Sequence, residues 1–126
     1  MNKSFEFICG EDYPLTPKQQ QLLELASRLG QERFAPRAAE FDREAKFPFA
    51  NYDDLRDAGL LALCVPESHG GFGADYATYA MVSAELGRYC GATALTFNMH
   101  VCTSLWTGLL SQDLEIGRAS CRERVS

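Results

Sequence analysis

The sequence predicts an all-α fold with four principal helices, and three observations lead to this prediction. Thr16-Pro17 is a typical helix start, with Thr as the N-cap and Pro at the first helical position. Asp75 can cap a third helix, whose helical pattern begins at Tyr76. The stretch from about residue 92 to about residue 110 is rich in Ala, Thr and Leu and contains no acidic or basic side chain except one His. Residues 1–15 show no clear helical period, and the weak alternation of Phe5, Phe7 and Ile8 indicates a tail or a docking strand.

The first helix is predicted to begin at Pro17 and to continue through Phe41, because apolar residues recur along it at helical spacing. Gly30 and Pro36 interrupt this pattern. Proline in a helix interior removes a hydrogen-bond donor and crowds the preceding turn. We therefore expect a kink or a restart near Pro36.

Phe47-Pro48-Phe49 is a second break, after which Pro48 is expected to open a short helix that runs to Ala58. Gly59 suits the left-handed position that ends a helix. The apolar run from Leu60 to Val65 is too short for a helix of its own, so we expect a buried, extended segment there.

A glycine loop follows this run. Pro66 stops any continuation, and Gly70, Gly71 and Gly73 allow backbone angles that other residues resist. A phosphate-binding loop is an alternative, but the Gly-Lys-Ser/Thr ending of a P-loop is missing. A structural turn is therefore the better interpretation.

The third helix starts after Asp75, a turn is expected between Gly87 and Gly91, and the fourth helix spans about Ala92 to Leu110. A helix with so few charges has to be covered nearly all round. Four helices cannot cover all of its large apolar side chains, so a partner surface is expected from outside this chain. These side chains are Leu95, Phe97, Leu105 and Trp106.

Composition excludes several classes of protein. The chain has 126 residues, a net charge of −5 and a pI near 5.0, which argues against a nucleic-acid surface because such surfaces are basic. The longest purely apolar run is far shorter than the roughly 20 residues of a membrane span. The N-terminus also lacks the apolar core of a signal peptide. We therefore expect a cytoplasmic protein.

The five cysteines do not predict a disulfide framework or a metal site. They are odd in number, and no two have a C-x-x-C spacing, so buried reduced thiols are expected instead. His69 and His100 are the two histidines, and neither has a second ligand at metal spacing. No metal site is predicted. The cysteines are Cys9, Cys64, Cys90, Cys102 and Cys121.

Three segments are expected along the chain: an N-terminal tail at 1–15, a helical domain at 16–114, and a non-native tail at 115–126. The last segment brings basic residues without an apolar period, and its portion 116–125 resembles one reading frame of a common sequencing adapter. A native basic tail is the alternative. If 115–126 is not native, the native reading frame ends near Leu114, and Cys121 is expected to be exposed.

The order of several short motifs resembles the N-terminal helical domain of the acyl-CoA dehydrogenase family. The likeness covers about 15–114 and begins with Leu-Thr before a long helix. Its most specific part is the Gly-Leu, Val-Pro-Glu and Gly-Gly-x-Gly order over 59–73. Glu85-Leu86 matches the Glu-Leu of the family, although the doubled Glu that is common there is Ala84-Glu85 here.

This resemblance implies a fragment of an FAD-dependent enzyme of fatty acid metabolism that oxidises an acyl-CoA thioester to the 2,3-enoyl-CoA. It places the catalytic base in a C-terminal helical domain and most flavin contacts in a middle β-domain. The signatures of the β-domain are missing from this sequence. No catalytic residue is therefore expected in this chain, its flavin contacts are unknown, and the isolated chain should be inactive. The full-length protein is expected to be a homo-oligomer.

The resemblance also implies that the fourth helix lines the inner end of the acyl pocket. By position, the substrate-binding candidates are Ala94, Asn98 and Cys102. Packing against neighbouring helices is the alternative role for each of them, because pocket walls and cores have similar compositions.

Two alternatives for the function remain. A flavin-dependent monooxygenase on the same fold is one, because His100 in Asn98-Met99-His100-Val101 resembles some of those relatives. A non-enzymatic helical interaction module is the other, and the charge-poor fourth helix argues against it.

Overall fold

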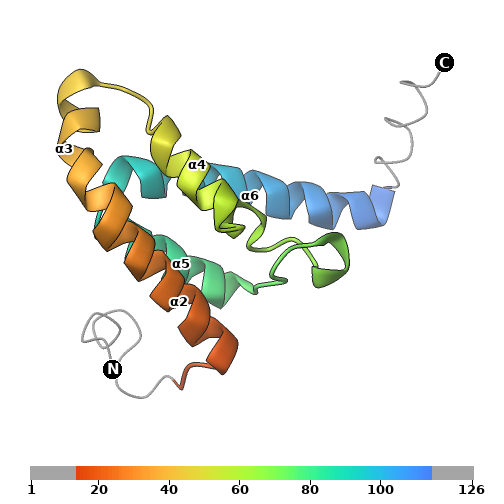
Figure 1. The fold of residues 1–126 in the computed structure, drawn as a ribbon. Helices are drawn as coiled ribbons and strands as arrows, with labels where there is room; N and C mark the ends of the chain where they lie inside the picture. Colours follow the sequence, from red (N-terminus) through yellow and green to blue (C-terminus); the bar gives the residue numbers. More distant parts are fainter. Residues whose placement is uncertain (1–13, 115–126) are drawn as a thin grey trace.

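The computed structural model describes residues 14–114, with side chains described for 14–108. Within this part the fold is all-α, as predicted, and no strand is found. The predicted tails, together with Cys9 and Cys121, lie outside the described residues. The elements are α2 (Pro17–Leu29), a π-helical turn η1 (Gly30–Phe34), α3 (Ala35–Glu44), α4 (Phe49–Asp57), short 3-10 turns η2 (Leu60–Ala62) and η3 (Glu67–His69), α5 (Tyr76–Gly87) and α6 (Gly91–Leu114) (Figure 1).

The start of α2 is the predicted cap. The Thr16 hydroxyl accepts a hydrogen bond from the backbone N–H of Gln19 at 3.2 Å, and the Gln19 side chain accepts one from the backbone N–H of Thr16 at 3.0 Å. This reciprocal arrangement satisfies two N–H groups that the first helical turn would leave unpaired.

The expected kink or restart near Pro36 takes the form of a π-helical turn. Helical backbone continues from Pro17 to Glu44, but over Gly30–Phe34 the turn is wider, and the N–H of Ala35 donates to the carbonyl of Gly30. Pro36 has no N–H for the preceding turn and its ring crowds a carbonyl there. A π-helical turn just before the proline accommodates both effects without breaking the helix. The segment ends at Ala45, which is left-handed with a φ of 49°.

The short helix α4 ends at Asp57, one residue before the predicted end, and Gly59 takes the predicted left-handed conformation with a φ of +75°. The prediction of an extended segment from Leu60 to Val65 was wrong, because Leu60–Ala62 forms a 3-10 turn and 63–65 continue in turns and a bend. Such a turn repeats every three residues, so it places Leu60 and Leu63 on one side, and both are fully buried.

The glycine loop is a structural turn, as the sequence favoured. Its backbone is tied to the preceding segment, 62–65, by three hydrogen bonds that end on the carbonyls of Ala62, Val65 and Leu63. Gly70 and Gly73 have positive φ values of 85° and 59°. Gly71 is needed for a different reason, since a Cβ there would lie 2.1 Å from the carbonyl oxygen of Val65. The space beside Gly71 is therefore filled by the loop itself.

Asp75 caps α5 by accepting a hydrogen bond from the backbone N–H of Thr78 at 2.8 Å. The hydrogen bonds from the Thr78 side chain and backbone lower the pKa of the Asp75 carboxyl below its ordinary value. A carboxyl with a depressed pKa in the folded state adds stability above its ordinary pKa of about 4. That contribution is lost as the pH falls through the lowered value.

We therefore expect Asp75→Asn to weaken the pH dependence of stability in the acid range. Asn caps a helix about as well as Asp but does not titrate. The thermal melting temperature of the wild-type chain should fall between pH 5 and pH 3 by more than that of the variant. An equal fall in both proteins would show that other carboxyls account for the acid dependence. Asp75→Ala should lower stability at pH 7 by about 1 kcal/mol.

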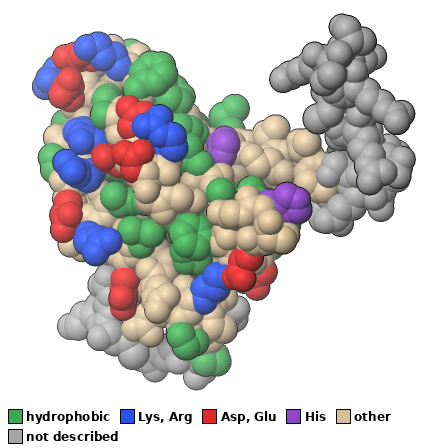
Figure 2. All heavy atoms as spheres, turned by 45° about the vertical axis from the view of Figure 1, so that its right-hand side comes forward, with side chains coloured by type: hydrophobic (Ala, Val, Ile, Leu, Met, Phe, Trp, Pro, Cys, Tyr) green, Lys and Arg blue, Asp and Glu red, His purple; other side chains and the backbone are tan. Residues whose placement is uncertain are grey.

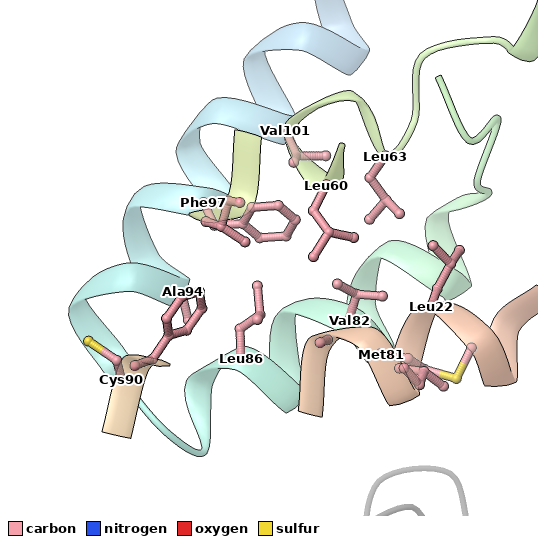
Figure 3. Packing of buried hydrophobic residues seen from close by; sticks show 14 residues of the cluster. Leu22, Leu60, Leu63, Met81, Val82, Leu86, Cys90, Ala94, Phe97 and Val101 are labelled. Atoms are coloured by element: carbon pink, nitrogen blue, oxygen red, sulfur yellow. The ribbon is translucent and has the colours of Figure 1, made fainter. Parts of the chain in front are cut away.

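The core lies where α5 packs against α2 and α6, with η2 closing it from the side. Phe97 of α6 is fully buried and points toward Leu60 (Figure 3). Leu86 and Val82 of α5 are likewise fully buried. The prediction that the cysteines are buried thiols holds for Cys90 alone among the described residues, because Cys64 is half-buried and Cys102 is exposed.

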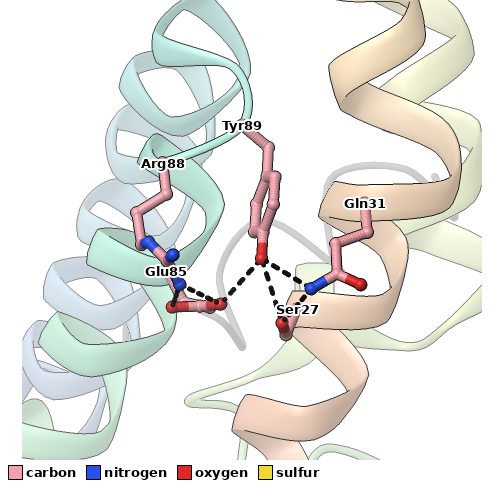
Figure 4. Close-up of polar contacts among 5 residues, drawn as sticks. All are labelled: Ser27, Gln31, Glu85, Arg88 and Tyr89. Atoms are coloured by element: carbon pink, nitrogen blue, oxygen red, sulfur yellow. Dashed lines mark hydrogen bonds and ion pairs between the residues drawn. The ribbon is translucent and has the colours of Figure 1, made fainter. Parts of the chain in front are cut away.

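A hydrogen-bonded cluster, which we call the polar clasp, joins α5 and the turn after it to α2 and η1 (Figure 4). It consists of Ser27, Gln31, Glu85, Arg88 and Tyr89. The Tyr89 hydroxyl lies 3.1 Å from the Ser27 hydroxyl, accepts from the Gln31 amide at 3.1 Å and donates to Glu85 at 3.3 Å. Glu85 is fully buried, and Arg88 donates to both of its carboxylate oxygens at 3.0 and 3.1 Å. The buried charge is therefore paired and hydrogen-bonded, as a buried carboxylate has to be.

The fourth helix begins one residue before the predicted start, and its C-terminal half projects beyond the other helices (Figure 1). Its large apolar residues divide as follows: Phe97 is buried and Leu105 is half-buried, but Leu95 and Trp106 are 62% and 60% exposed. Met99 is also 65% exposed. The expectation that these side chains cannot all be covered is therefore confirmed for Leu95 and Trp106.

Candidate functional site

Asn98 is the centre of a polar cluster between α5 and α6. Its side-chain oxygen Oδ1 accepts a hydrogen bond from the Tyr79 hydroxyl at 2.8 Å and a second one from the Ser83 hydroxyl. Tyr79 and Ser83 are four residues apart on α5, so one face of that helix presents both hydroxyls to Asn98. Sequence reasoning missed these two residues. Their four-residue spacing on a helix was the signal that could have indicated a shared role.

The Tyr79 hydroxyl is protonated at neutral pH. Burial raises the pKa of Tyr79 above its ordinary value, and smaller contributions come from the neighbouring Cys102, Tyr76 and Cys64. The phenol therefore stays a hydrogen-bond donor, as its bond to Asn98 requires. The centre of its ring lies 6.5 Å from the centre of the Phe97 ring, so the Tyr79 ring packs against the hydrophobic core.

Cys64 lies at the edge of this cluster and is a poor nucleophile. Burial raises the pKa of its thiol, and the negative charge of Asp75 raises it further. Since the thiolate is the reactive form of cysteine, Cys64 remains an unreactive thiol at neutral pH. The polar cluster can therefore bind and orient a molecule through hydrogen bonds, and Cys64 adds no covalent chemistry to it.

The three residues proposed from the sequence follow one side of α6 at intervals of four, but they lie at different depths. Ala94 is 7% exposed, and its Cβ would lie 3.6 Å from a Cβ added at Gly87, so it belongs to the packing between α5 and α6. Asn98 is half-buried and Cys102 is exposed. A molecule bound against this side of α6 could therefore reach Asn98 and Cys102, and Ala94 only from its edge.

An apolar stripe borders this cluster on the exposed side of α6. We define it by Leu95, Met99 and Trp106, which are 60–65% exposed and separated by four and seven residues, a helical spacing. Residues 91–108 contain no Asp, Glu, Lys or Arg. Figure 2 shows the same contrast, with charged side chains gathered over the N-terminal helices and none on the projecting arm beside the grey atoms. Such stripes are typical of contact surfaces.

The side chain of His100 contacts η2 and Tyr52 rather than the Asn98 cluster. Its ring nitrogen Nε2 lies 2.9 Å from the carbonyl oxygen of Leu61, and its ring meets that of Tyr52 edge-on with the ring centres 6.5 Å apart. A carbonyl oxygen only accepts, so Nε2 carries the hydrogen and donates it. His100 thereby ties α6 to η2, which is a structural role.

Among the described residues, 14–114, no helix is long and apolar enough to cross a membrane.

Comparisons with known proteins agree on one family. The family model described as "Acyl-CoA dehydrogenase, N-terminal domain" matches residues 16–111. Cyclohex-1-ene-1-carbonyl-CoA dehydrogenase of Syntrophus aciditrophicus is 43% identical over 81 residues, which is 64% of this chain and 20% of that protein. The 3-sulfinopropanoyl-CoA desulfinase of Paraburkholderia xenovorans is 37% identical over 81 residues, which is 64% of this chain and 21% of that protein.

The mitochondrial short-chain specific acyl-CoA dehydrogenase of Homo sapiens is 37% identical over 94 residues, which is 75% of this chain and 22% of that protein. The chain thus spans about a fifth of the length of these curated relatives. No significant match to a solved structure was found.

Proposed function

The chain belongs to the acyl-CoA dehydrogenase family, as an N-terminal domain of it, and we propose that it is part of an FAD-dependent enzyme that oxidises an acyl-CoA thioester to the 2,3-enoyl-CoA. The observation that carries this proposal is the match of the family model over 96 residues, from 16 to 111. The helices that this match covers are those on which the Asn98 cluster is built.

In this proposal the domain forms one wall of the acyl pocket. Asn98 and Cys102 are the substrate-binding residues that a ligand can reach, and Ala94 supports them from the packed side of α6. The neighbouring apolar stripe adds the hydrophobic surface that an acyl chain needs, since ligand pockets are mostly apolar with a few fixed polar groups.

Neither the glycine loop nor α6 fits the diphosphate of a flavin. The glycine loop is closed on itself at Gly71, and no cationic side chain lies on α6 between 91 and 108 that could meet a diphosphate. We therefore place the FAD contacts and the catalytic base in the part of the protein that this chain lacks. The flavin, once bound there, would accept the hydride.

The partner surfaces follow from the same argument. Leu95, Met99 and Trp106 would be covered by the missing β-domain and C-terminal helical domain of the same protein, because the matched relatives are about five times longer than their shared region. Acyl-CoA is the substrate partner. A homo-oligomeric full-length protein and a cytoplasmic location are further parts of the proposal.

The isolated 126-residue chain is expected neither to bind FAD stoichiometrically nor to oxidise acyl-CoA. The measurement is the absorbance of the purified chain between 350 and 500 nm after incubation with FAD and gel filtration, where bound flavin gives its characteristic bands. The product of the complete reading frame is the control, and it should retain FAD and lose its colour when an acyl-CoA reduces it. Bound FAD in the short chain would contradict the placement of the flavin site.

The two alternatives from the sequence are not favoured. The relatives include a cyclohex-1-ene-1-carbonyl-CoA dehydrogenase and a short-chain specific acyl-CoA dehydrogenase, and His100, which suggested a monooxygenase, is bound to the Leu61 carbonyl. An independent interaction module would need a polar exterior, whereas α6 exposes Leu95, Met99 and Trp106 and carries no Asp, Glu, Lys or Arg over 91–108.

A further inference from the structure

The hydrogen bonds around Asn98 fix which of its atoms is available to a ligand. Both hydroxyl donors of α5 point at Oδ1, so its two lone pairs are used. The amide nitrogen Nδ2 has no acceptor among the described side chains and backbone groups that contact Asn98. Asn98 is half-buried, and Nδ2 is the donor that its side chain can offer to a ligand on that side of α6.

The charge around this donor favours a neutral acceptor. Residues 91–108 carry no Lys or Arg, and the described partners of Asn98 are the neutral hydroxyls of Tyr79 and Ser83. An anionic group brought here would lose its water without gaining a cation, which is strongly unfavourable. A carbonyl or hydroxyl oxygen avoids this loss and can still accept from Nδ2.

We propose that Asn98, oriented by Tyr79 and Ser83, selects acyl groups that carry a neutral carbonyl or hydroxyl oxygen at the end that reaches α6. This inference rests on the proposed function, in which α6 forms a wall of the acyl pocket. An acyl chain with a plain aliphatic end would cover Nδ2 and leave it without a hydrogen-bond acceptor. Burying an unpaired donor costs free energy, so such a chain should bind less well. Asn98 is then the binding residue, and Tyr79 and Ser83 are positioning residues.

The test uses the full-length holoenzyme and three substrates of equal length, at the length between five and eight carbons that it oxidises fastest. They are the unsubstituted acyl-CoA, its counterpart with a carbonyl at the penultimate carbon, and the mono-CoA ester of the dicarboxylic acid. We expect kcat/KM for the carbonyl substrate to exceed that for the unsubstituted one about tenfold, the ratio expected from one hydrogen bond. The dicarboxylic ester should be the poorest of the three.

Variants separate the roles of the residues. Asn98→Leu should abolish the preference, so that kcat/KM for the carbonyl substrate no longer exceeds that for the unsubstituted one. Tyr79→Phe and Ser83→Ala should reduce the preference through a higher KM for the carbonyl substrate alone. Tyr76→Phe is the matched control, because Tyr76 is 71% exposed and has no hydrogen bond to Asn98, and it should keep the wild-type ratio.

The outcomes distinguish this inference from the proposed function. A wild-type enzyme that prefers the unsubstituted or the dicarboxylic substrate would overturn the inference and leave the proposed function standing. The same holds if Asn98→Leu keeps the wild-type ratio. A holoenzyme that oxidises none of the acyl-CoA thioesters would instead refute the proposed function.

Discussion

Replacing Gly30 by alanine is expected to lower the free energy of unfolding of this chain by about 3 kcal/mol, because the added methyl group has no room. A Cβ at Gly30 would lie 2.0 Å from the ring carbon Cδ2 of Tyr89 and 2.6 Å from two more ring carbons. The ring cannot simply turn away, since its hydroxyl is held by Ser27, Gln31 and Glu85. The methyl group therefore either strains the π-helical turn or breaks the clasp.

Gly87→Ala is the matched control for this change. Gly87 is also a helical glycine, it is exposed, and its added Cβ would meet the methyl group of Ala94 at 3.6 Å, an ordinary contact. Alanine stabilises a helix by up to about 1 kcal/mol relative to glycine, so this variant should be as stable as the wild type or slightly more stable.

Urea unfolding followed by circular dichroism at 222 nm measures both variants. If Gly30→Ala is too unstable to show a transition, the double variant Gly30→Ala with Tyr89→Ala should recover part of the loss, because the ring that the methyl group meets is gone. Equal stability of Gly30→Ala and Gly87→Ala would contradict the close packing of Tyr89 on the π-helical turn.

The sequence predicted the interruption at Gly30 and Pro36 but not its form. Helix breakers are visible in one sequence because their effect is local, and this is also why the caps at Thr16 and Asp75 and the helix end at Gly59 could be predicted. The ring of Tyr89, which lies 59 residues away, packs against Gly30 of this turn. Contacts between residues so far apart leave no periodic pattern in one sequence.

The error at Leu60 to Val65 has a related cause. A short apolar run does not distinguish a strand from tight helical turns. The turns are decided by the glycine loop, whose backbone N–H groups bond to the carbonyls of 62, 63 and 65 and leave no edge for a strand. For the candidate site, the family resemblance located α6 and Asn98. The hydroxyls of Tyr79 and Ser83 became visible only when α5 and α6 were packed together.

Phe97→Ala is expected to lower the free energy of unfolding of the isolated chain by about 3–5 kcal/mol, whereas Leu95→Ala should change it by less than about 0.5 kcal/mol. Both residues lie on α6 two positions apart, but Phe97 is fully buried against the core and Leu95 is 62% exposed. Removing the Phe97 ring would leave a cavity that the surrounding helices can fill only in part.

The melting temperature of Phe97→Ala should fall by more than about 12 °C, since 1 kcal/mol corresponds to about 4–8 °C for a domain of this size. Phe97→Leu keeps most of the volume and should lose less, which keeps the test valid if the alanine variant does not fold. A fall of a few degrees for Phe97→Ala would show that this ring is not a centre of the core.

Leu95→Ala also tests whether the remainder of the protein covers the apolar stripe. If the remainder of the protein covers the apolar stripe, Leu95 is buried in the full-length enzyme and Leu95→Ala should become destabilising there, by about 2 kcal/mol or more. Asn51, by contrast, is already fully buried within this chain, where Thr93 and Arg37 bond to it, so the effect of Asn51→Ala should be similar in both proteins. Thermal unfolding of the short and full-length proteins provides the comparison. A Leu95→Ala variant that stays neutral in the full-length enzyme would mean that the stripe faces solvent, and that the missing domains contact this one elsewhere.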